Sequence, residues 1–170
     1  MRKYLMPDLI LPTYRDVTPQ LCREWGIRAI LSDIDNTLAP YEQPRSDEEI
    51  RAWIRSLNEA GISVALISNN HADRVDLFNS DLNLIAYADA SKPFGKMLRA
   101  AMKEMGSEPS NTAMLGDQLL TDALAGNLLG LKVFIVPPIR DKRSAFVRFK
   151  RWLERPVIRR YHKKHGGRSQ

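Results

Sequence analysis

The chain has 170 residues, of which 44% are hydrophobic, and a formal net charge of +6. This length and composition predict one globular domain with a short appendage. The single cysteine, Cys22, excludes an internal disulfide and fits a reducing compartment. No apolar run is long enough to span a bilayer, and Pro7 and Asp8 interrupt the faint likeness of the N-terminus to a signal peptide. We therefore expect a cytoplasmic protein.

The charge is unevenly distributed along the chain. Residues 140–170 contain 12 lysines and arginines but only 2 acidic residues, whereas residues 1–139 carry a net charge of −4. We therefore divide the chain into a main domain with an N-terminal extension (1–139) and a basic C-terminal helix or tail (140–170) that is not an independent domain.

Apolar runs and helical patterns alternate along the main domain. Continuous apolar runs predict five strands buried on both faces, at residues 27–33, 63–68, 84–88, 112–117 and 132–137. Helical patterns lie between them: one capped at Ser46, a short one at 71–80, one from Pro93 to Gly106, and one at 119–130. This alternation predicts an α/β fold with a three-layer, doubly wound and mainly parallel sheet. The apolar segment 9–14 before the first strand either packs on the sheet edge or touches lipid.

Charged and polar side chains stand where the predicted strands end. Asp33, Ser68 and Asp117 each close a strand, and Lys92 follows a fourth strand after a short loop. The carboxyl ends of parallel strands share one edge of the sheet, where sites form in such folds. Two neighbouring carboxylates, such as Asp33 and Asp35, repel each other unless a cation intervenes, and Mg²⁺ prefers such hard oxygen ligands. The sequence therefore predicts a Mg²⁺ site at this edge.

The same set of side chains fits phosphoryl transfer. That reaction needs a nucleophile, a proton donor for the leaving oxygen, and positive charge around the phosphoryl oxygens. Asp33 is a carboxylate and is ionised at neutral pH, Ser68 can donate a hydrogen bond to a phosphoryl oxygen, and Lys92 supplies positive charge.

Four segments resemble the four motifs of the haloacid-dehalogenase (HAD) superfamily, in the family's order. They are ILSDIDNTL, ALISNN, ASKPFGKML and MLGDQLLTD, and the resemblance covers Ile27 to Asp122. The second and third motifs resemble subfamily IIIA. The opening PDLILPTYRDVT and the basic C-terminus resemble the YqeG-type branch, which is related to mitochondrial phosphatidylglycerophosphate phosphatases. The resemblance implies a capless HAD-like Rossmannoid fold and an HAD-type phosphatase.

The resemblance also implies roles for the aspartates. Asp33 attacks phosphorus and becomes aspartyl-phosphate, while Asp35 protonates the leaving group and then activates water. Mg²⁺ is held by Asp33, Asp117 and the backbone carbonyl of Asp35.

The remaining matched positions bind the phosphoryl group or support the site. Ser68, the backbone at Asn69 and Lys92 hold the phosphoryl group, and Lys92 also steadies the nucleophile. Thr37 positions the first loop, and Asp122 supports the metal through water.

The spacing of the motifs leaves no room for a cap domain. Residues 38–46 form a short loop, and one helix and one strand occupy the interval from Ser68 to Lys92. An open site favours a large substrate, such as a phospholipid head group (for example that of phosphatidylglycerophosphate) or a phosphoprotein. The alternative is closure by a second subunit, as in some small phosphosugar phosphatases, which would make the protein a homo-oligomer.

The basic C-terminal segment leaves several partners open. Phe146, Phe149, Trp152 and Leu153 fall near one helical face, among the cations Arg148, Lys150, Arg151 and Arg155. Aromatic residues beside cations suit a helix lying on an anionic membrane, although they can equally cover the domain. Nucleic acid is a further partner, because a basic tail binds phosphate backbones. A non-catalytic module that docks nucleic acid or a ribosome through this tail is the alternative to an enzyme.

Overall fold

A six-stranded, all-parallel sheet forms the centre of the protein. The structure is a computed structural model that describes residues 2–140 and 145–165, with side chains described for 4–140 and 154–164. The strand order is β1-β6-β5-β2-β3-β4. The strands are β1 Leu9–Ile10, β2 Ala29–Ser32, β3 Ser63–Ile67, β4 Ile85–Tyr87, β5 Thr112–Gly116 and β6 Lys132–Ile135.

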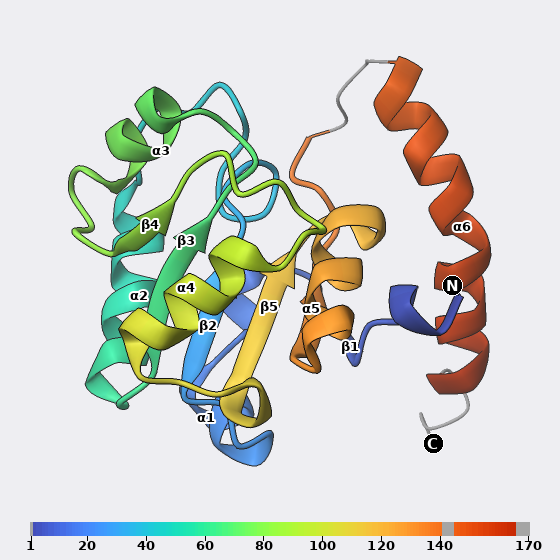
Figure 1. Ribbon diagram of the computed structural model, residues 1–170, viewed down its shortest axis with the longest axis horizontal. Coiled ribbons are helices and arrows are strands. Elements are labelled where there is room, and N and C mark those ends of the chain that lie inside the picture. The colour runs from blue at the N-terminus through green and yellow to red at the C-terminus, as the bar shows by residue number, and fades with distance from the viewer. Residues whose placement is uncertain (1, 141–144, 166–170) are drawn as a thin grey trace.

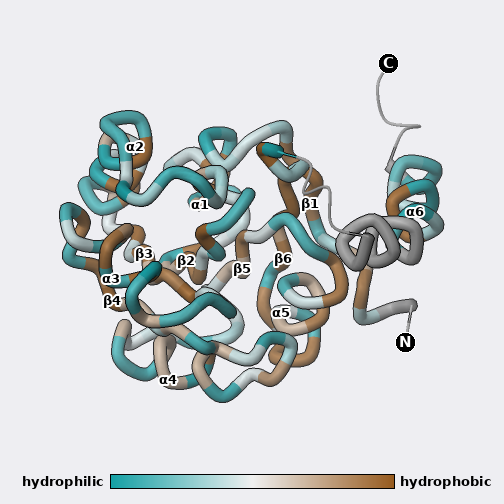
Figure 2. The backbone as a smooth tube through the Cα atoms, turned by 90° about the horizontal axis from the view of Figure 1, so that it is seen from above, coloured by the Kyte–Doolittle hydropathy of each residue, from teal (hydrophilic) through white to brown (hydrophobic). Residues whose placement is uncertain are grey.

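Helices cover both faces of the sheet, which confirms the predicted three-layer, doubly wound α/β fold. Viewed along the strands, α1, α2 and α3 lie on one face and α4 and α5 on the other (Figure 2). The helices are α1 Pro19–Glu24, α2 Glu48–Glu59, α3 Ala72–Asn79, α4 Lys96–Met105, α5 Leu124–Leu129 and α6 Ala145–His165; the shorter helical turns are η1 Arg2–Leu5, η2 Tyr14–Asp16, η3 Pro109–Asn111 and η4 Leu119–Ala123.

All five predicted strands form, and the sheet gains a sixth strand that the sequence did not predict. The short strand β1 runs parallel to β6, with Leu9 opposite Phe134 and Ile10 opposite Ile135. A two-residue strand leaves too short a pattern to recognise from the sequence. Of the two alternatives for the N-terminal extension, the structure shows packing on the sheet edge.

Two helices begin later than the sequence predicted. Ser46 is not the cap of α2, because Asp47 occupies that position and its carboxylate accepts a hydrogen bond from the Ile50 N–H at 2.9 Å. A carboxylate caps as well as a hydroxyl and also interacts favourably with the helix dipole. The predicted start at Pro93 is likewise wrong, because α4 begins at Lys96.

The two faces of the sheet are held by separate apolar clusters. On one face, Trp53 and Leu57 of α2 are buried, and the Trp53 indole N–H donates to the Val17 carbonyl at 3.0 Å. On the other face, Leu98 of α4 packs with Leu31 of β2. Because β2 is covered on both sides and paired on both edges, its carboxyl end is a rigid place for a functional side chain.

The C-terminal helix α6 lies beyond the β1 edge of the sheet, next to the N-terminal segment (Figures 1 and 2). Its Val157 and Tyr161 side chains are buried, and the Tyr161 hydroxyl accepts a hydrogen bond from the Ile10 N–H at 3.1 Å. The side chains of the predicted aromatic face (Phe146, Phe149, Trp152 and Leu153) lie outside the described part of the chain. Among the described helices, none is long and apolar enough to cross a membrane.

Candidate active site

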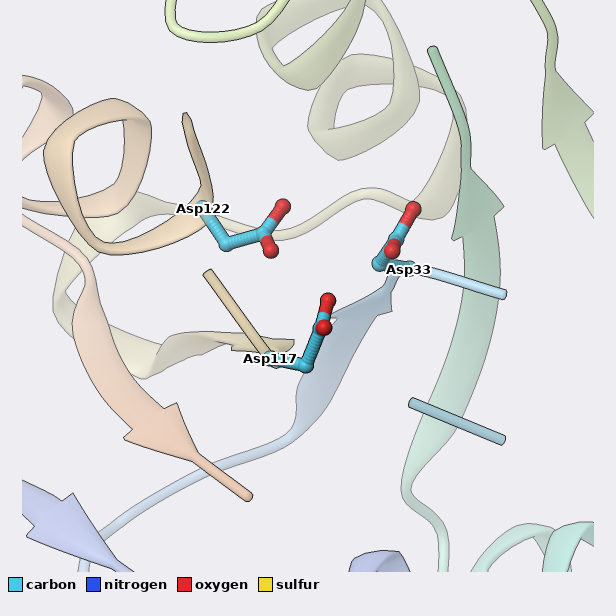
Figure 3. A group of neighbouring side chains, drawn as sticks. All are labelled: Asp33, Asp117 and Asp122. Carbon is cyan, nitrogen blue, oxygen red and sulfur yellow. The ribbon is translucent and has the colours of Figure 1, made fainter. Parts of the chain in front are cut away.

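Three neighbouring strands deliver three functional side chains to one edge of the sheet. Asp33 follows β2, Ser68 follows β3 and Asp117 follows β5, and β2 pairs in parallel with both of its neighbours. These side chains therefore meet at the carboxyl edge, as the sequence predicted. Figure 3 shows Asp33 and Asp117 with their carboxylates turned toward a shared space, which Asp122 reaches from the other side.

Asp33, Asp117 and Asp122 form a tight acidic group. Each offers a carboxylate oxygen, and these oxygens all lie within 4.8 Å of one another. Asp122 comes from η4, and it approaches β5 closely because Gly116 has no side chain. A Cβ atom on Gly116 would lie 2.3 Å from the Asp122 carboxyl carbon, so any larger residue there would displace the aspartate.

Lys92 lies within this acidic group and is itself buried. Its Nζ donates to Asp33 Oδ1 at 2.8 Å, to Asp122 Oδ1 at 2.7 Å and to the Ile67 carbonyl at 2.9 Å. Burial acts to lower the pKa of Lys92, but the carboxylates of Asp122 and Asp33 outweigh burial and leave that pKa raised. The lysine is therefore a fixed positive charge behind the predicted nucleophile.

Asn69 fixes the loop that delivers Lys92. Its side-chain carbonyl accepts from the Lys92 backbone N–H at 2.7 Å, and its amide donates to the Lys92 backbone carbonyl at 3.3 Å. The sequence predicted Asn69 as a phosphate-binding residue. In the structure, the Asn69 side chain makes two hydrogen bonds to the Lys92 backbone, and these join the loop after β3 to the loop after β4.

Asp35 lines the site from the loop after β2, and its carboxylate is anchored from behind. Arg74 of α3 pairs with Asp35 Oδ1 at 3.1 Å, and the Asn70 side-chain amide donates to Asp35 Oδ2 at 3.1 Å. The same arginine donates to the Pro44 carbonyl at 3.1 Å and stacks over the Phe78 ring. Arg74 therefore fixes Asp35 relative to both α3 and the loop that leads into α2.

Ser68 and Thr37 are both buried beside the site. Ser68 Oγ accepts a hydrogen bond from the Asn70 N–H at 3.0 Å, which leaves the hydroxyl proton available for another acceptor. Thr37 Oγ1 is buried and has no hydrogen-bond partner among the described residues.

These groups surround an open, polar pocket. It holds about 530 Å³, counting the space at its mouth, and its lining residues are Asp33, Asp35, Ser68, Asn69, Asn70, Lys92, Gln118 and Thr121. No helix or strand is inserted between β2 and α2, which are separated by residues 33–47, and only α3 and β4 lie between β3 and α4. The predicted absence of a cap therefore holds at both positions.

The acidic group fits a divalent cation. Burial raises the pKa of Asp33 to about 6, against the opposing effect of Lys92. Burial, with the nearby Asp122 and Asp33, raises the pKa of Asp117 well above its usual range. Moreover, Asp117 Oδ1 is buried with no hydrogen-bond partner in the described part of the chain, a costly arrangement that a bound cation would relieve. Three carboxylates beside one lysine can thus hold a metal ion through hard oxygen ligands.

Two members of the site were not predicted from the sequence. Arg74 and Asn70 hold Asp35. Asn70 ends the motif ALISNN after β3 but was given no role of its own, and a lone arginine in a helix is normally a surface residue. The structure also groups the carboxylate of Asp122 with those of Asp33 and Asp117, and its expected support of the metal through water stays a prediction.

Comparison with known proteins identifies the family. Residues 41–130 match the family model of haloacid dehalogenase-like hydrolases. Over 158 residues the chain is 32% identical to the "Probable phosphatase YqeG" of Bacillus subtilis (strain 168), an alignment that covers 93% of this chain and 92% of that protein. Because so few of the 170 residues fall outside that alignment, it includes Asp33 and Asp35, which precede the segment matched by the family model.

Two solved structures share the fold. The 3-deoxy-D-manno-octulosonate 8-phosphate phosphatase of Yersinia pestis superposes with a TM-score of 0.51 at 19% identity, covering 72% of this chain and 69% of that one. The hypothetical protein XCC2798 of Xanthomonas campestris superposes with a TM-score of 0.52 at 21% identity, covering 75% and 73%.

The chain therefore belongs to the haloacid dehalogenase-like hydrolase family. Its similarity to the Bacillus YqeG protein along nearly its whole length confirms the predicted YqeG-type branch and makes it an HAD-type phosphatase.

Divalent-cation binding is expected to strengthen as the pH rises. Protons compete with the cation for a carboxylate whose pKa is raised, so a pKa of about 6 for Asp33 alone predicts about fourfold tighter Mg²⁺ binding at pH 7.5 than at pH 5.5. Asp117 adds to this difference in the same direction. Isothermal titration calorimetry in two buffers of different ionisation enthalpy measures both the affinity and the protons released. Equal affinity at the two pH values, without proton release, would contradict cation binding by Asp33 and Asp117.

Proposed function

We propose that the protein is a Mg²⁺-dependent phosphomonoesterase that acts through an aspartyl-phosphate on Asp33. The observation that carries this proposal is the position of Asp33 at the end of a central strand. There it lines an open polar pocket, contacts Lys92 and is grouped with Asp117 and Asp122. Bound Mg²⁺ supplies positive charge that reduces the repulsion between the nucleophile and the phosphoryl group.

Asp33 and Asp35 divide the reaction between them. A carboxylate oxygen of Asp33 forms a bond to phosphorus while the bond from phosphorus to the ester oxygen breaks, and Asp35 gives its proton to the leaving oxygen. Asp35 then takes a proton from water as that water attacks the aspartyl-phosphate. Inorganic phosphate leaves, and Asp33 is regenerated.

Lys92, Ser68 and Asn69 hold the phosphoryl group in this proposal. The Ser68 hydroxyl proton is available because Ser68 Oγ already accepts from the Asn70 N–H. Lys92 lies against Asp33 at 2.8 Å, so its charge acts on the nucleophile and on the phosphoryl oxygens together.

Removing the nucleophile tests the mechanism. We expect Asp33→Asn to lower the hydrolysis of p-nitrophenyl phosphate with Mg²⁺ by at least about 1000-fold, because an amide cannot form the covalent intermediate. Wild-type protein quenched during turnover should carry a hydroxylamine-labile phosphoryl group that the variant lacks. The control is Asp76→Asn, which changes an exposed aspartate of α3. Unchanged turnover in Asp33→Asn would rule out this mechanism.

Loss of the anchor behind Asp35 tests the acid and base role. We expect Arg74→Ala to lower kcat by about 10- to 100-fold, because a misplaced acid and base loses its alignment with the leaving oxygen. The KM for p-nitrophenyl phosphate should change by less than about threefold, since Arg74 is not among the residues that line the pocket. The matched control is Arg45→Ala, an exposed arginine that binds Ser80. An unchanged kcat in Arg74→Ala would show that Asp35 needs no anchor.

For the substrate, we propose the phosphorylated head group of a membrane phospholipid, such as that of phosphatidylglycerophosphate. The pocket is lined by polar residues alone, so it suits a phosphate group better than the carbon skeleton of a large ligand. Phe94 lies two residues after Lys92, in the loop between β4 and α4, and is 74% exposed, a costly position for an aromatic side chain in water. An exposed apolar residue on the loop that carries Lys92, together with an uncapped polar pocket, supports a substrate presented at a lipid surface.

Phosphate release from vesicles tests this substrate. We expect Phe94→Ser to lower the ratio of phosphatidylglycerophosphate turnover in vesicles to p-nitrophenyl phosphate turnover by about fivefold, through loss of the lipid contact. The control is Leu128→Ser, which changes an exposed leucine on α5. Faster turnover of soluble phosphosugars or phosphopeptides than of the lipid would overturn the substrate. Salt-sensitive nucleic-acid binding without turnover of any phosphate ester would instead support the non-catalytic alternative.

A further inference from the structure

The C-terminal helix places a buried carboxylate at the start of η4, the turn that carries Asp122. Glu154 of α6 is 5% exposed, and its Oε1 accepts hydrogen bonds from the Leu119 N–H at 2.9 Å and the Leu120 N–H at 3.2 Å. A buried carboxylate is costly unless its hydrogen bonds are satisfied. Glu154 is moreover one of only two acidic residues in the otherwise basic segment 140–170.

The two N–H groups that Glu154 binds begin the helical turn η4. The first N–H groups of a helix have no partner within the helix, and a neighbouring side chain usually caps them. Gln118, at the cap position, makes no such side-chain bond. Glu154 therefore caps η4 from 34 and 35 positions away in the chain, and its negative charge is favourable at a helix start.

This turn connects two of the acidic residues of the site. It begins two residues after Asp117 and contains Asp122. The Gln118 N–H donates to Asp122 Oδ2 at 3.1 Å, and the Asp122 N–H donates to the Gln118 carbonyl at 3.0 Å. The position of the turn thus sets the distance between the two carboxylates. Movement at Leu119 and Leu120 would separate them.

Apolar packing holds Glu154 in register with the turn. Val157 of α6 is buried in one cluster with Leu119, and Ile158 packs at the margin of that cluster. Glu154, Val157, Ile158 and Tyr161 are spaced as one face of a helix. This face of α6 is therefore the one that docks on the domain.

We propose that Glu154 is a positioning residue that fixes the turn carrying Asp117 and Asp122, so that both carboxylates reach one cation. The C-terminal helix is then part of the catalytic architecture, in addition to any partner that its exposed cations bind. This inference rests on the metal site of the proposed function, and it is tested with a measurement that needs neither metal nor turnover.

Amide hydrogen exchange and metal binding are measured on the full chain. In metal-free protein, Glu154→Ala should speed exchange at Leu119 and Leu120 by about tenfold or more, while amides of β2 stay unchanged. Mg²⁺ binding measured by calorimetry should weaken by about 10- to 100-fold, as expected when a group that supports metal ligands is lost. The matched control is Glu59→Ala, which removes an exposed glutamate at the end of α2.

A conservative variant separates positioning from general loss of stability. Glu154→Gln retains a carbonyl oxygen that can accept from the same N–H groups, so we expect it to restore most of the protection and affinity lost in Glu154→Ala. If Glu154→Ala does not fold, Glu154→Gln should still speed exchange at Leu119 and Leu120 about threefold relative to the wild type, while exchange at the amides of β2 stays unchanged. Wild-type exchange and Mg²⁺ affinity in both variants would overturn the inference. A wild-type protein that binds no Mg²⁺ overturns the proposed function instead, and exchange at these two amides then decides the role of Glu154.

Discussion

The rest of the site depends on one interaction, the pairing of the Lys92 ammonium group with the carboxylates of Asp33 and Asp122. Three carboxylates at the end of an apolar sheet would repel one another strongly, and burial already raises the pKa of Asp33 to about 6. One buried cation at 2.8 and 2.7 Å from two of them offsets part of that repulsion. It leaves an excess of negative charge that a divalent cation can balance.

The parallel sheet brings these charges together with few degrees of freedom. β2 lies between β3 and β5 in strict register, with Ser32 opposite both Leu66 and Leu115. The backbone hydrogen bonds of the sheet therefore fix the positions of the residues that follow each strand, whatever side chains those residues carry. Gly116 permits the last approach, that of Asp122 to β5. The site is preorganised by topology, as electrostatic stabilisation of developing charge requires.

The sequence predicted the parts that depend on local patterns and missed those that depend on distant contacts. The strand ends at Asp33 and Asp117 were predictable because continuous apolar runs mark buried strands. The cap of α2 was misplaced by one residue, since both Ser46 and Asp47 are good capping residues and only packing decides between them. The contacts of Arg74 and Glu154 could not be predicted, because their partners lie 39 and 35 or 34 positions away and a charged residue in a helix normally faces solvent. The spacing of Val157 and Tyr161 was the one local signal that this face of α6 is buried.

A site without a cap needs rigid support from contacts below the pocket. In this protein, the hydrogen bonds of Asn69, Arg74 and Glu154 provide such contacts. Family members with a cap can enclose the substrate and order the catalytic groups by closure, but nothing closes over this pocket within the described residues. Instead, each functional loop is tied to another part of the chain: the Asn69 side chain holds the Lys92 backbone, Arg74 holds Asp35, and Glu154 holds the start of the turn that carries Asp122. None of these contacts covers the mouth of the pocket. The arrangement thus combines fixed positions for the groups proposed as catalytic with an unobstructed approach, which a phosphate group carried on a large surface would require.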